Sequence, residues 1–493
     1  MRNMPEIKLG IVAVSRDCFP IELSKNRLEK LSKAVKAKGV SAVVAETIIE
    51  SEADALKALD ELRAKGANAA VVYLGNFGPE GPTTIFIKRF HGPAMVCAAA
   101  EETGANLFSE RGDAYCGILN CSYNLALRNL SAHIPEKPVA LPDELAAEIA
   151  DFVPTARIAV GLKKLKVFAF GPRPHDFYAC NAPIKPLYDL GVEVMENSEL
   201  DLFEIYKAAE GNHDIADIQA DMENEMGAGN TYPELLPKLA QYESALRKFM
   251  EENLGEREYA VFADKCWPAF EAAFGFVPCY VNSRLTGEGI PVACEVDIYG
   301  AVSEYMTQCA ANAPATLLDI NNTVPADLAA DTSKLNGVPP EDLFMGFHCG
   351  NTTKEMVCDD CSIKYQAIMH RLMEPGKEPD ITRGTLEGMI KPGKATIFRL
   401  QSTANCELRS YLAEGSTLDI DPKSFGSIGI IAIKGMRRFH RHVLVGGNFP
   451  HHTALTLDHV GKTLFDAVRL MTGTVPARPL PEGNLYPLEN PFA

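Results

Sequence analysis

The stretch "IKLGIVAVS" (residues 7–15) indicates the fold class of this chain. It is a short and mostly apolar run, which is typical of a strand buried on both faces of a sheet. The segment "LSKNRLEKLSKAVKAKG" (23–39) then shows helical periodicity and ends in a glycine. Strand-like runs at 40–46 and 68–75 enclose a second helical pattern at 52–67. Apolar strands that alternate with amphipathic helices predict a parallel sheet with helices on both faces.

A second cycle of the same kind begins at Leu165, after the helical segment "TARIAVGLKK" (155–164). From about residue 311 onward, strand-like runs are separated by Gly, Pro and Asp turns, and a helix is expected near the end of the chain. We therefore predict an α/β protein with two doubly wound, Rossmann-like parallel-sheet domains and a β-rich, barrel-like C-terminal domain. The predicted domains are an N-terminal α/β domain at 1–164, a central α/β domain at 165–310, and a C-terminal β-rich domain at 311–493 that carries a metal-binding histidine loop. A proline-rich tail at 475–493 is expected to run over the surface.

The composition of the 493 residues is that of an ordinary globular protein, with 46% hydrophobic and 23% charged residues. A net charge of −17 argues against a basic surface for nucleic acid or for an anionic membrane. We see no signal-peptide pattern at the N-terminus, and no apolar run approaches the roughly 20 residues of a membrane helix. These features predict a cytoplasmic protein without nucleic-acid or membrane partners.

The cysteines support the same location. Thirteen cysteines, an odd number without the spacing of a disulfide framework, predict reduced thiols. The only close pair, Cys358 and Cys361, forms a lone CxxC, whereas structural zinc normally requires four ligands. No GxGxxG motif follows the first strand, so we expect no dinucleotide cofactor.

Two adjacent histidines, His451 and His452, follow a proline in "GGNFPHHTAL" (446–455). We expect this pair in a loop between the last strand and the last long helix, a position where functional sites are often built. A metal bound by histidine usually needs carboxylates as well. Glu295 in "GIPVACEVDIYGAVSEYM" and Asp319 in "APATLLDINNTVP" are acids in apolar surroundings, where a carboxylate is costly unless it is paired or metal-bound.

Each of these residues also has a purely structural interpretation. Glu295 can be a helix N-terminal acid that the helix dipole stabilises, and Asp319 can belong to an Asp–Asn turn. His348, at the end of the strand-like run in "MGFHCGNT", can be a hydrogen-bonded core histidine. His440 and His442 alternate with arginine and are expected on a solvent-facing strand. Taken together, two oxygen ligands and an imidazole describe a site for a divalent cation such as Mn²⁺, with metal-assisted proton transfer or hydrolysis as its chemistry.

Four motifs in the chain resemble the L-fucose isomerase and L-arabinose isomerase superfamily, and they occur in the family's order. The 24-residue separation of Glu295 from Asp319 is similar to that of the fucose isomerase branch. The resemblance covers the second α/β cycle and the β-rich third well, and the first cycle in architecture. The motifs are "GEGIPVACEVDIYGA", "LLDINNT", "FHCGNT" and "GGNFPHHTAL".

The resemblance implies an aldose–ketose isomerase that works through a cis-enediol and assembles as a hexamer, with each active site bordered by a neighbouring subunit. On matching positions, Glu295 and Asp319 would bind Mn²⁺ and also act as the acid/base pair. His452 would be the imidazole ligand, with His451 nearer the substrate. His348 matches a position that the arabinose branch uses as a ligand, but the spacing before it differs, so we assign it to binding the sugar.

The resemblance also leads to expectations about the substrate. Arg16 follows the first strand, at the edge where open α/β sheets bind ligands, and we expect it to reach the distal end of a sugar held by an adjacent subunit. An anionic C6 group, as in sulfoquinovose, would suit an arginine. Trp267, the only tryptophan, can stack on a sugar face. The structural alternatives are an ion pair with Asp17 for Arg16 and core packing for Trp267.

Two other classes of function remain open at the level of sequence. A metal-dependent hydrolase or lyase acting on a carbohydrate could use the same acids and histidine. A non-catalytic two-domain sugar-binding protein could bind a sugar between its α/β domains, although the β-rich third with its histidine pair argues against it.

Overall fold

The computed structural model describes residues 3–479 and divides the chain into two compact units. The N-terminal unit consists of residues 5–161 and 466–473, and the main unit of 3–4, 162–465 and 474–479. Most of the proline-rich tail lies outside the described residues. No helix within residues 3–479 is long and apolar enough to cross a membrane. The division into three domains stays a prediction.

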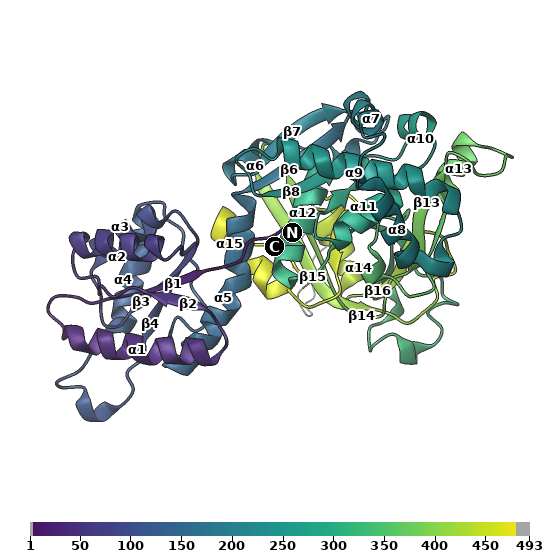
Figure 1. Cartoon of the computed structure of the whole chain (residues 1–493). Helices are drawn as coiled ribbons and strands as arrows, with labels where there is room; N and C mark the ends of the chain where they lie inside the picture. The colour runs from purple at the N-terminus through teal and green to yellow at the C-terminus, as the bar shows by residue number, and fades with distance from the viewer. Residues whose placement is uncertain (1–2, 480–493) are drawn as a thin grey trace. The chain divides into compact units, whose positions relative to one another are not determined.

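The N-terminal unit is built on a parallel sheet with the strand order β2-β1-β3-β4-β5 (Figure 1). Its strands are β1 (Leu9–Val14), β2 (Ala42–Val44), β3 (Ala69–Leu74), β4 (Ala94–Ala99) and β5 (Val139–Ala140). Its helices are α1 (Ile21–Ala37), α2 (Glu52–Ala64), α3 (Glu80–Phe90), α4 (Ala114–Leu127) and most of α5 (Pro142–Leu162), with the C-terminal part of α15 (Gly461–Thr472).

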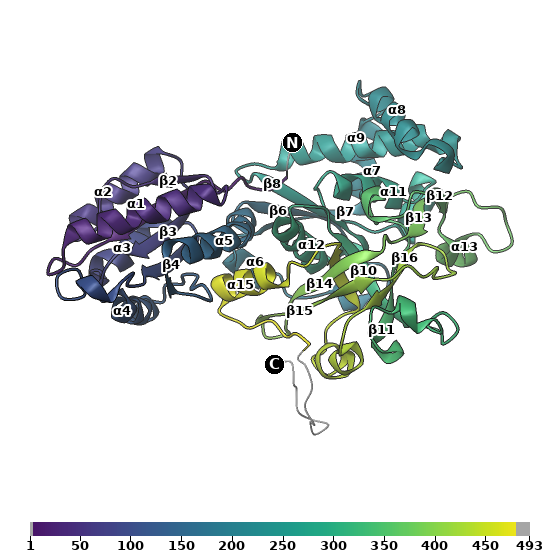
Figure 2. The same cartoon turned by 90° about the horizontal axis from the view of Figure 1, so that it is seen from below.

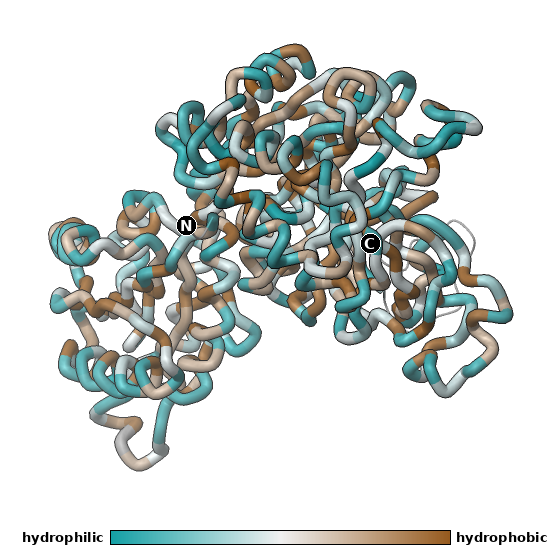
Figure 3. Tube along the Cα trace, turned by 45° about the vertical axis from the view of Figure 1, so that its right-hand side comes forward, coloured by the Kyte–Doolittle hydropathy of each residue, from teal (hydrophilic) through white to brown (hydrophobic). Residues whose placement is uncertain are grey.

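Burial explains why β1 is apolar at every position. Val12 and Val14 belong to one core cluster, whereas Leu9, Ile11 and Ala13 belong to another. Because successive side chains of a strand point to opposite faces, these two clusters are the helix-covered faces of the sheet. The apolar stretches appear as brown segments inside the unit in Figure 3. The doubly wound parallel sheet predicted from the sequence is confirmed.

The main unit begins with a second parallel sheet, in the order β7-β6-β8-β9. Its strands are β6 (Leu165–Gly171), β7 (Glu193–Ser198), β8 (Tyr259–Ala263) and β9 (Val292–Ala293). The helices of this region are α6 (Lys185–Asp189), α7 (Glu199–Ala208), α8 (Ile215–Met226), α9 (Leu236–Asn253), α10 (Ala269–Phe274), α11 (Cys279–Gly287) and α12 (Ile298–Ala311). Phe168, Phe170 and Phe262 from β6 and β8 belong to one buried apolar cluster of this region.

The rest of the main unit is a mixed sheet in the order β11-β10-β17-β14-β15-β16-β13-β12, in which β11 also pairs with β16 (Figure 2). That extra pairing closes the strands from β11 to β16 into a barrel, which confirms the predicted barrel-like architecture. The strands are β10 (Thr316–Thr323), β11 (Leu343–His348), β12 (Ser362–Tyr365), β13 (Arg383–Met389), β14 (Gly393–Ser402), β15 (Leu408–Thr417), β16 (Ser427–Ala432) and β17 (His452–Thr456).

Short helical segments complete the chain. They are α13 (Ala367–Met373), α14 (Met436–Phe439), the π-helical η9 (His440–Val445), and the 3₁₀ turns η1 (Gly104–Asn106), η2 (Tyr178–Cys180), η3 (Gly227–Gly229), η4 (Pro233–Leu235), η5 (Cys294–Val296), η6 (Thr332–Lys334), η7 (Pro340–Asp342) and η8 (Lys354–Met356).

The structure corrects two expectations near the C-terminus. His440 and His442 were expected on a strand, but they lie in η9. Asp342 accepts hydrogen bonds from the backbone N–H groups of Gly435 and Arg437, so a tertiary contact helps to start a helix in a segment with a strand-like pattern. The histidine pair therefore follows a helical segment, and His452 is the first residue of β17 rather than part of a loop after the last strand.

Helix α4 allows a test of the packing in the N-terminal unit. A Cβ atom at Gly117 would lie 2.1 Å from the backbone oxygen of Phe77, whereas a Cβ at Gly81 in α3 would meet nothing within 4 Å. We expect Gly117→Ala to lower the free energy of unfolding by about 1–3 kcal/mol, because a backbone atom must move. Gly81→Ala, the matched control, should leave stability unchanged or raise it slightly. Urea denaturation followed by circular dichroism measures both, and equal stabilities would contradict the packing.

Candidate active site

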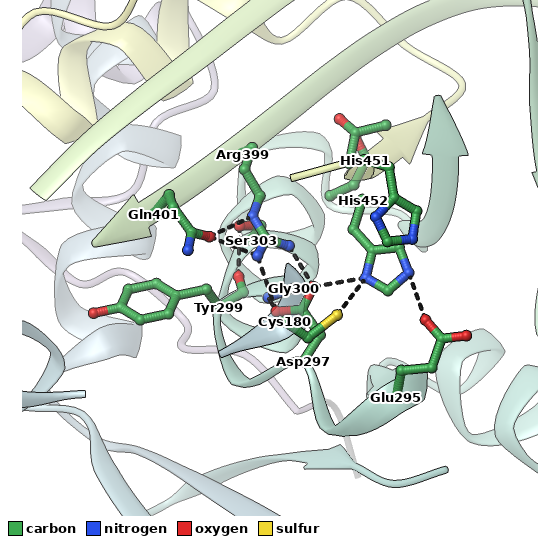
Figure 4. A network of polar contacts seen from close by, with 12 residues as sticks. Cys180, Glu295, Asp297, Tyr299, Gly300, Ser303, Arg399, Gln401, His451 and His452 are labelled. Carbon is green, nitrogen blue, oxygen red and sulfur yellow. Dashed lines mark hydrogen bonds and ion pairs between the residues drawn. The ribbon is translucent and has the colours of Figure 1, made fainter. Parts of the chain in front are cut away.

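Three side chains that are far apart in the sequence converge in the main unit. The Nε2 atom of His452 lies 3.0 Å from Oε2 of Glu295 and 3.3 Å from Oδ1 of Asp319. His452 is fully buried, and the side chains of Glu295 and Asp319 are 15% and 20% exposed. Figure 4 shows Glu295 and His452 pointing toward one another. One end of this cluster is therefore open to a ligand from solvent.

Two different sheets position these residues. Glu295 lies in η5, directly after β9, at the carboxyl edge of the parallel sheet where α/β folds bind ligands. Its φ is 61°, in the left-handed region that favours glycine. The neighbouring Val296 donates its N–H to the oxygen of Asp264 at 2.7 Å, which holds this turn. Strained backbone of this kind is often found at functional sites.

Asp319 and His452 come from the barrel. They are directly opposite each other in the antiparallel pair of β10 and β17. Because the side chains of opposed residues lie on the same face of a sheet, the register alone brings this carboxylate and this imidazole together. The local sequence explains why both strands form: Leu317 and Leu318 precede Asp319, and Ala454 and Leu455 follow His452, all fully buried.

The polar atoms of the cluster lack ordinary partners. Oε2 of Glu295, Oδ1 of Asp319 and Nε2 of His452 are buried and contact one another, and no other hydrogen bond to these three atoms is found within the described residues. An unsatisfied buried polar atom is costly, and most such atoms in proteins are paired. Two carboxylate oxygens and an imidazole nitrogen that face one another are a suitable ligand set for a divalent cation such as Mn²⁺. These residues fit a metal ion.

The charges of the cluster are linked. Burial acts to raise the pKa of Asp319. The hydrogen bond that Asp319 accepts from His452 and the nearby imidazoles of His348 and His451 outweigh burial, so the pKa of Asp319 is lowered. Burial acts to lower the pKa of His452, but Cys180 and the hydrogen bonds that His452 donates to Asp297 and Asp319 raise this pKa well above its usual value. Proton binding and metal binding at His452 therefore compete.

A second layer fixes the orientation of His452, and sequence reasoning missed it. Nδ1 of His452 donates to Oδ2 of Asp297 at 2.8 Å, and Arg399 binds both carboxylate oxygens of Asp297 (Figure 4). The side chains of Asp297 and Arg399 are 1% and 0% exposed. Burial acts to raise the pKa of Asp297, but Arg399 and His452 outweigh burial and hold this pKa well below its usual value. This carboxylate–histidine arrangement directs the Nε2 lone pair toward the cluster.

Two sequence signals could have identified this layer. Asp297 follows Glu295 after a single residue, and it caps α12 by accepting the N–H of Gly300 at 2.9 Å. Arg399 directly follows the apolar residues Ile397 and Phe398 in "KATIFRLQS", where a strand arginine needs a buried partner.

The structure also places His348 and His451 in this region. The ring of His348 lies 5.9 Å from that of His452, and Nε2 of His451 lies 3.6 Å from Oδ1 of Asp319. Nδ1 of His348 accepts the backbone N–H of Cys349 at 3.0 Å, which leaves the proton of the neutral ring on Nε2. A nitrogen that carries a proton donates hydrogen bonds, so this tautomer favours contact with a sugar hydroxyl over metal ligation.

Trp267 and Arg16 differ in their placement. Trp267 follows the carboxyl end of β8, its ring lies 5.8 Å from that of His175, and it packs on a cluster that includes Cys294, the neighbour of Glu295. Arg16 belongs to the N-terminal unit and is not part of the cluster. Its guanidinium lies over the ring of Phe77 at 5.4 Å, and no ion pair joins it to Asp17 among residues 3–479.

The second layer leads to a prediction about metal affinity. We expect Asp297→Asn to weaken the binding of Mn²⁺ by about 10- to 100-fold, because His452 loses its charged partner. Titration calorimetry on metal-stripped protein measures this affinity, with Asp419→Asn at an exposed position as the matched control.

Circular dichroism should accompany that titration, because a lone buried Arg399 is itself destabilising. If Asp297→Asn does not fold, the double variant Asp297→Asn/Arg399→Gln removes the unpaired cation and tests the same contact. Unchanged affinity in a folded variant would contradict the role of Asp297.

Comparison with known proteins agrees with this geometry. The chain matches "Fucose/sulfoquinovose isomerase, N-terminal domain" over residues 10–163 and "L-fucose isomerase, C-terminal domain" over residues 346–476. It is 26% identical over 313 residues to a sulfoquinovose isomerase of Alkalicoccus urumqiensis, covering 63% of this chain and 64% of that protein, which is just under two thirds.

Longer matches cover almost the whole chain. Sulfoquinovose isomerases of Priestia aryabhattai and Priestia megaterium are each 23% identical over 471 residues, which is 93% of this chain and 96% of each relative. Both terminal domains of one family are thus present in one chain, in the same order. The chain belongs to the fucose isomerase family.

Proposed function

We propose that the protein is a divalent-cation-dependent aldose–ketose isomerase and that its substrate is a C6-sulfonated aldose, sulfoquinovose. The observation that carries the proposal is the convergence of Glu295, Asp319 and His452 on one point, with three buried ligand atoms that have no other hydrogen-bond partner among residues 3–479. The names of the similar proteins support both the reaction class and the sugar.

The residues suit the chemistry of an isomerase. A proton must leave C2 of the aldose, a cis-enediol forms, and a proton must arrive at C1, so the reaction needs one base and one acid. A bound divalent cation supplies electrostatic stabilisation of the negative charge that develops on the sugar oxygens. The lowered pKa of Asp319, caused by its partners against the effect of burial, keeps its carboxylate ionised and able to accept a proton.

Each acid has a second oxygen for proton transfer. Oε2 of Glu295 and Oδ1 of Asp319 are the oxygens that face His452, so Oε1 and Oδ2 are the second oxygens of the pair. In our proposal these outer oxygens exchange protons with C1 and C2 of the sugar. His452, fixed by Asp297, holds its place and does not move a proton.

Other residues are proposed to bind the sugar. His348 would donate from Nε2 to a hydroxyl group, and His451, which is half-buried and lies edge-on to Phe177 at 5.4 Å between ring centres, would border the substrate. Trp267, which is half-buried at the carboxyl end of β8, would stack on a sugar face. Arg16, which is half-buried and forms no ion pair among residues 3–479, would bind the sulfonate from an adjacent subunit.

The finer details belong to the same proposal. Mn²⁺ is the cation we propose, because oxygen ligands with one imidazole suit it. A homo-hexamer follows from the family and from the assignment of Arg16 to a neighbouring subunit. A cytoplasmic location is supported by the thirteen cysteines, all of which lie within residues 3–479 as free thiols. Neither nucleic acid nor a membrane is proposed as a partner.

The first test removes the acid/base pair. We expect Glu295→Gln and Asp319→Asn each to lower kcat for sulfoquinovose isomerisation by at least about 10²-fold, because each removes one proton-transfer group. Glu407→Gln, at an exposed position, is the control. Treatment with EDTA should abolish the activity and Mn²⁺ should restore it.

The assay also separates the alternatives. Formation of ketose with one deuterium from D₂O at C1 supports an isomerase. Cleavage of the sugar instead would show a hydrolase or lyase, and chelator-independent binding without turnover would show a binding protein. Near-normal rates in either acid variant would overturn the acid/base assignment.

A second test concerns the anionic group. We expect Arg16→Ala to raise KM for sulfoquinovose by about 10- to 100-fold, because one charge-assisted hydrogen bond to the sulfonate is lost. The KM for quinovose, the same sugar without the sulfonate, should change little. Arg89→Ala, an exposed arginine of the same unit, serves as the control. An equal effect of Arg16→Ala on the KM of both sugars would show that Arg16 does not bind the sulfonate.

A further inference from the structure

Three buried cysteines lie directly behind Glu295. Cys266 follows β8, Cys279 begins α11, and Cys294 is the residue before Glu295. Each of the three is 2% exposed, and together with Val277 they form a small cluster of their own. The proposed isomerase mechanism uses none of these thiols.

Two of the sulfur atoms are spaced like the ligands of a soft metal. The Sγ atoms of Cys266 and Cys294 are 3.9 Å apart. Two thiolates bound to tetrahedral zinc, at about 2.3 Å each, lie about 3.8 Å from one another. The side-chain amide of Gln366 donates to Sγ of Cys266 at 3.2 Å, a contact that stabilises negative charge on this sulfur. The pair can therefore hold such an ion with almost no rearrangement.

Oxygen and nitrogen donors lie beside Cys294. Sγ of Cys294, a carboxylate oxygen of Glu295 and a ring nitrogen of His348 all lie within 4.8 Å of one another. Two sulfurs and a carboxylate oxygen make three protein ligands for Zn²⁺ or Cd²⁺, which leaves one position for water. Glu295, 15% exposed, connects this buried set with solvent.

We propose that Cys266, Cys294 and Glu295 form a binding site for a thiophilic cation beside the Mn²⁺ site. Each thiol releases its proton to solvent when the cation binds. Glu295 belongs to both sets, so a soft cation draws this carboxylate away from Asp319 and His452 and inhibits the enzyme. The inhibition rests on the proposed function, whereas the binding does not.

Cadmium titration of metal-stripped protein tests the binding. Thiolate coordination gives an ultraviolet charge-transfer band that oxygen and imidazole ligands do not give. All variants carry Cys358→Ser, so that the partly exposed CxxC pair does not contribute. We expect the band in this parent and in Cys121→Ala, a buried cysteine of the N-terminal unit, and its loss in Cys266→Ala. No band in the parent, or an undiminished band in Cys266→Ala, overturns the site.

Inhibition of the Mn²⁺-loaded protein by Zn²⁺ tests the shared carboxylate. We expect Cys266→Ala to raise the half-inhibitory Zn²⁺ concentration at least about tenfold over the parent and over Cys121→Ala, because the soft site has lost a ligand. Equal sensitivity would mean that Zn²⁺ displaces Mn²⁺ directly, which overturns the link between the two sites. A cadmium band in a protein without isomerase activity would refute the proposed function and leave the thiol site intact.

Discussion

The hydrogen bond between Nδ1 of His452 and Asp297 is the contact on which the site depends. At 2.8 Å it fixes both the ring and its tautomer, so Nε2 can only face Glu295 and Asp319. Asp297 is itself fixed by the paired guanidinium of Arg399, which is fully buried. Breaking a buried ion pair of this kind costs about 3–5 kcal/mol, because it leaves an uncompensated charge in the interior.

This chain of contacts also joins the two halves of the main unit. Asp297 caps α12, which packs against β14 and β17 of the barrel, and Arg399 extends from β14 toward that cap. One carboxylate of the ligand set comes from the edge of the parallel sheet, and the other carboxylate and the imidazole come from the barrel. A site shared between two sheets can place ligands on opposite sides of a bound ion. The edge of a single flat sheet places its ligands on one side only.

The environment of Glu295 shows how closely hard and soft donors are placed. Its carboxylate faces His452 on one side, and the sulfur of its neighbour Cys294 lies 3.9 Å from that of Cys266 on the other. Selectivity for Mn²⁺ over zinc cannot follow from affinity alone, because Zn²⁺ binds most nitrogen, oxygen and sulfur ligands more tightly. In our proposal the position of the Glu295 carboxylate decides which of the two ligand sets is complete, and the left-handed turn at Glu295 holds that position.

The sequence by itself determined the fold class and the identity of the converging residues. Continuous apolar strands such as 9–14 can only be buried on both faces, and acids within apolar runs, such as Glu295 and Asp319, require a charged partner. The local pattern failed at His440 and His442, because Asp342, distant in the sequence, starts a helix there.

Only the tertiary structure decided the second layer and the spacing of the ligands. Register places Asp319 opposite His452, and burial pairs Asp297 with Arg399 across about a hundred residues of chain. These contacts depend on strand pairing and on side-chain direction between distant segments, and periodicity along a single segment carries no information about either.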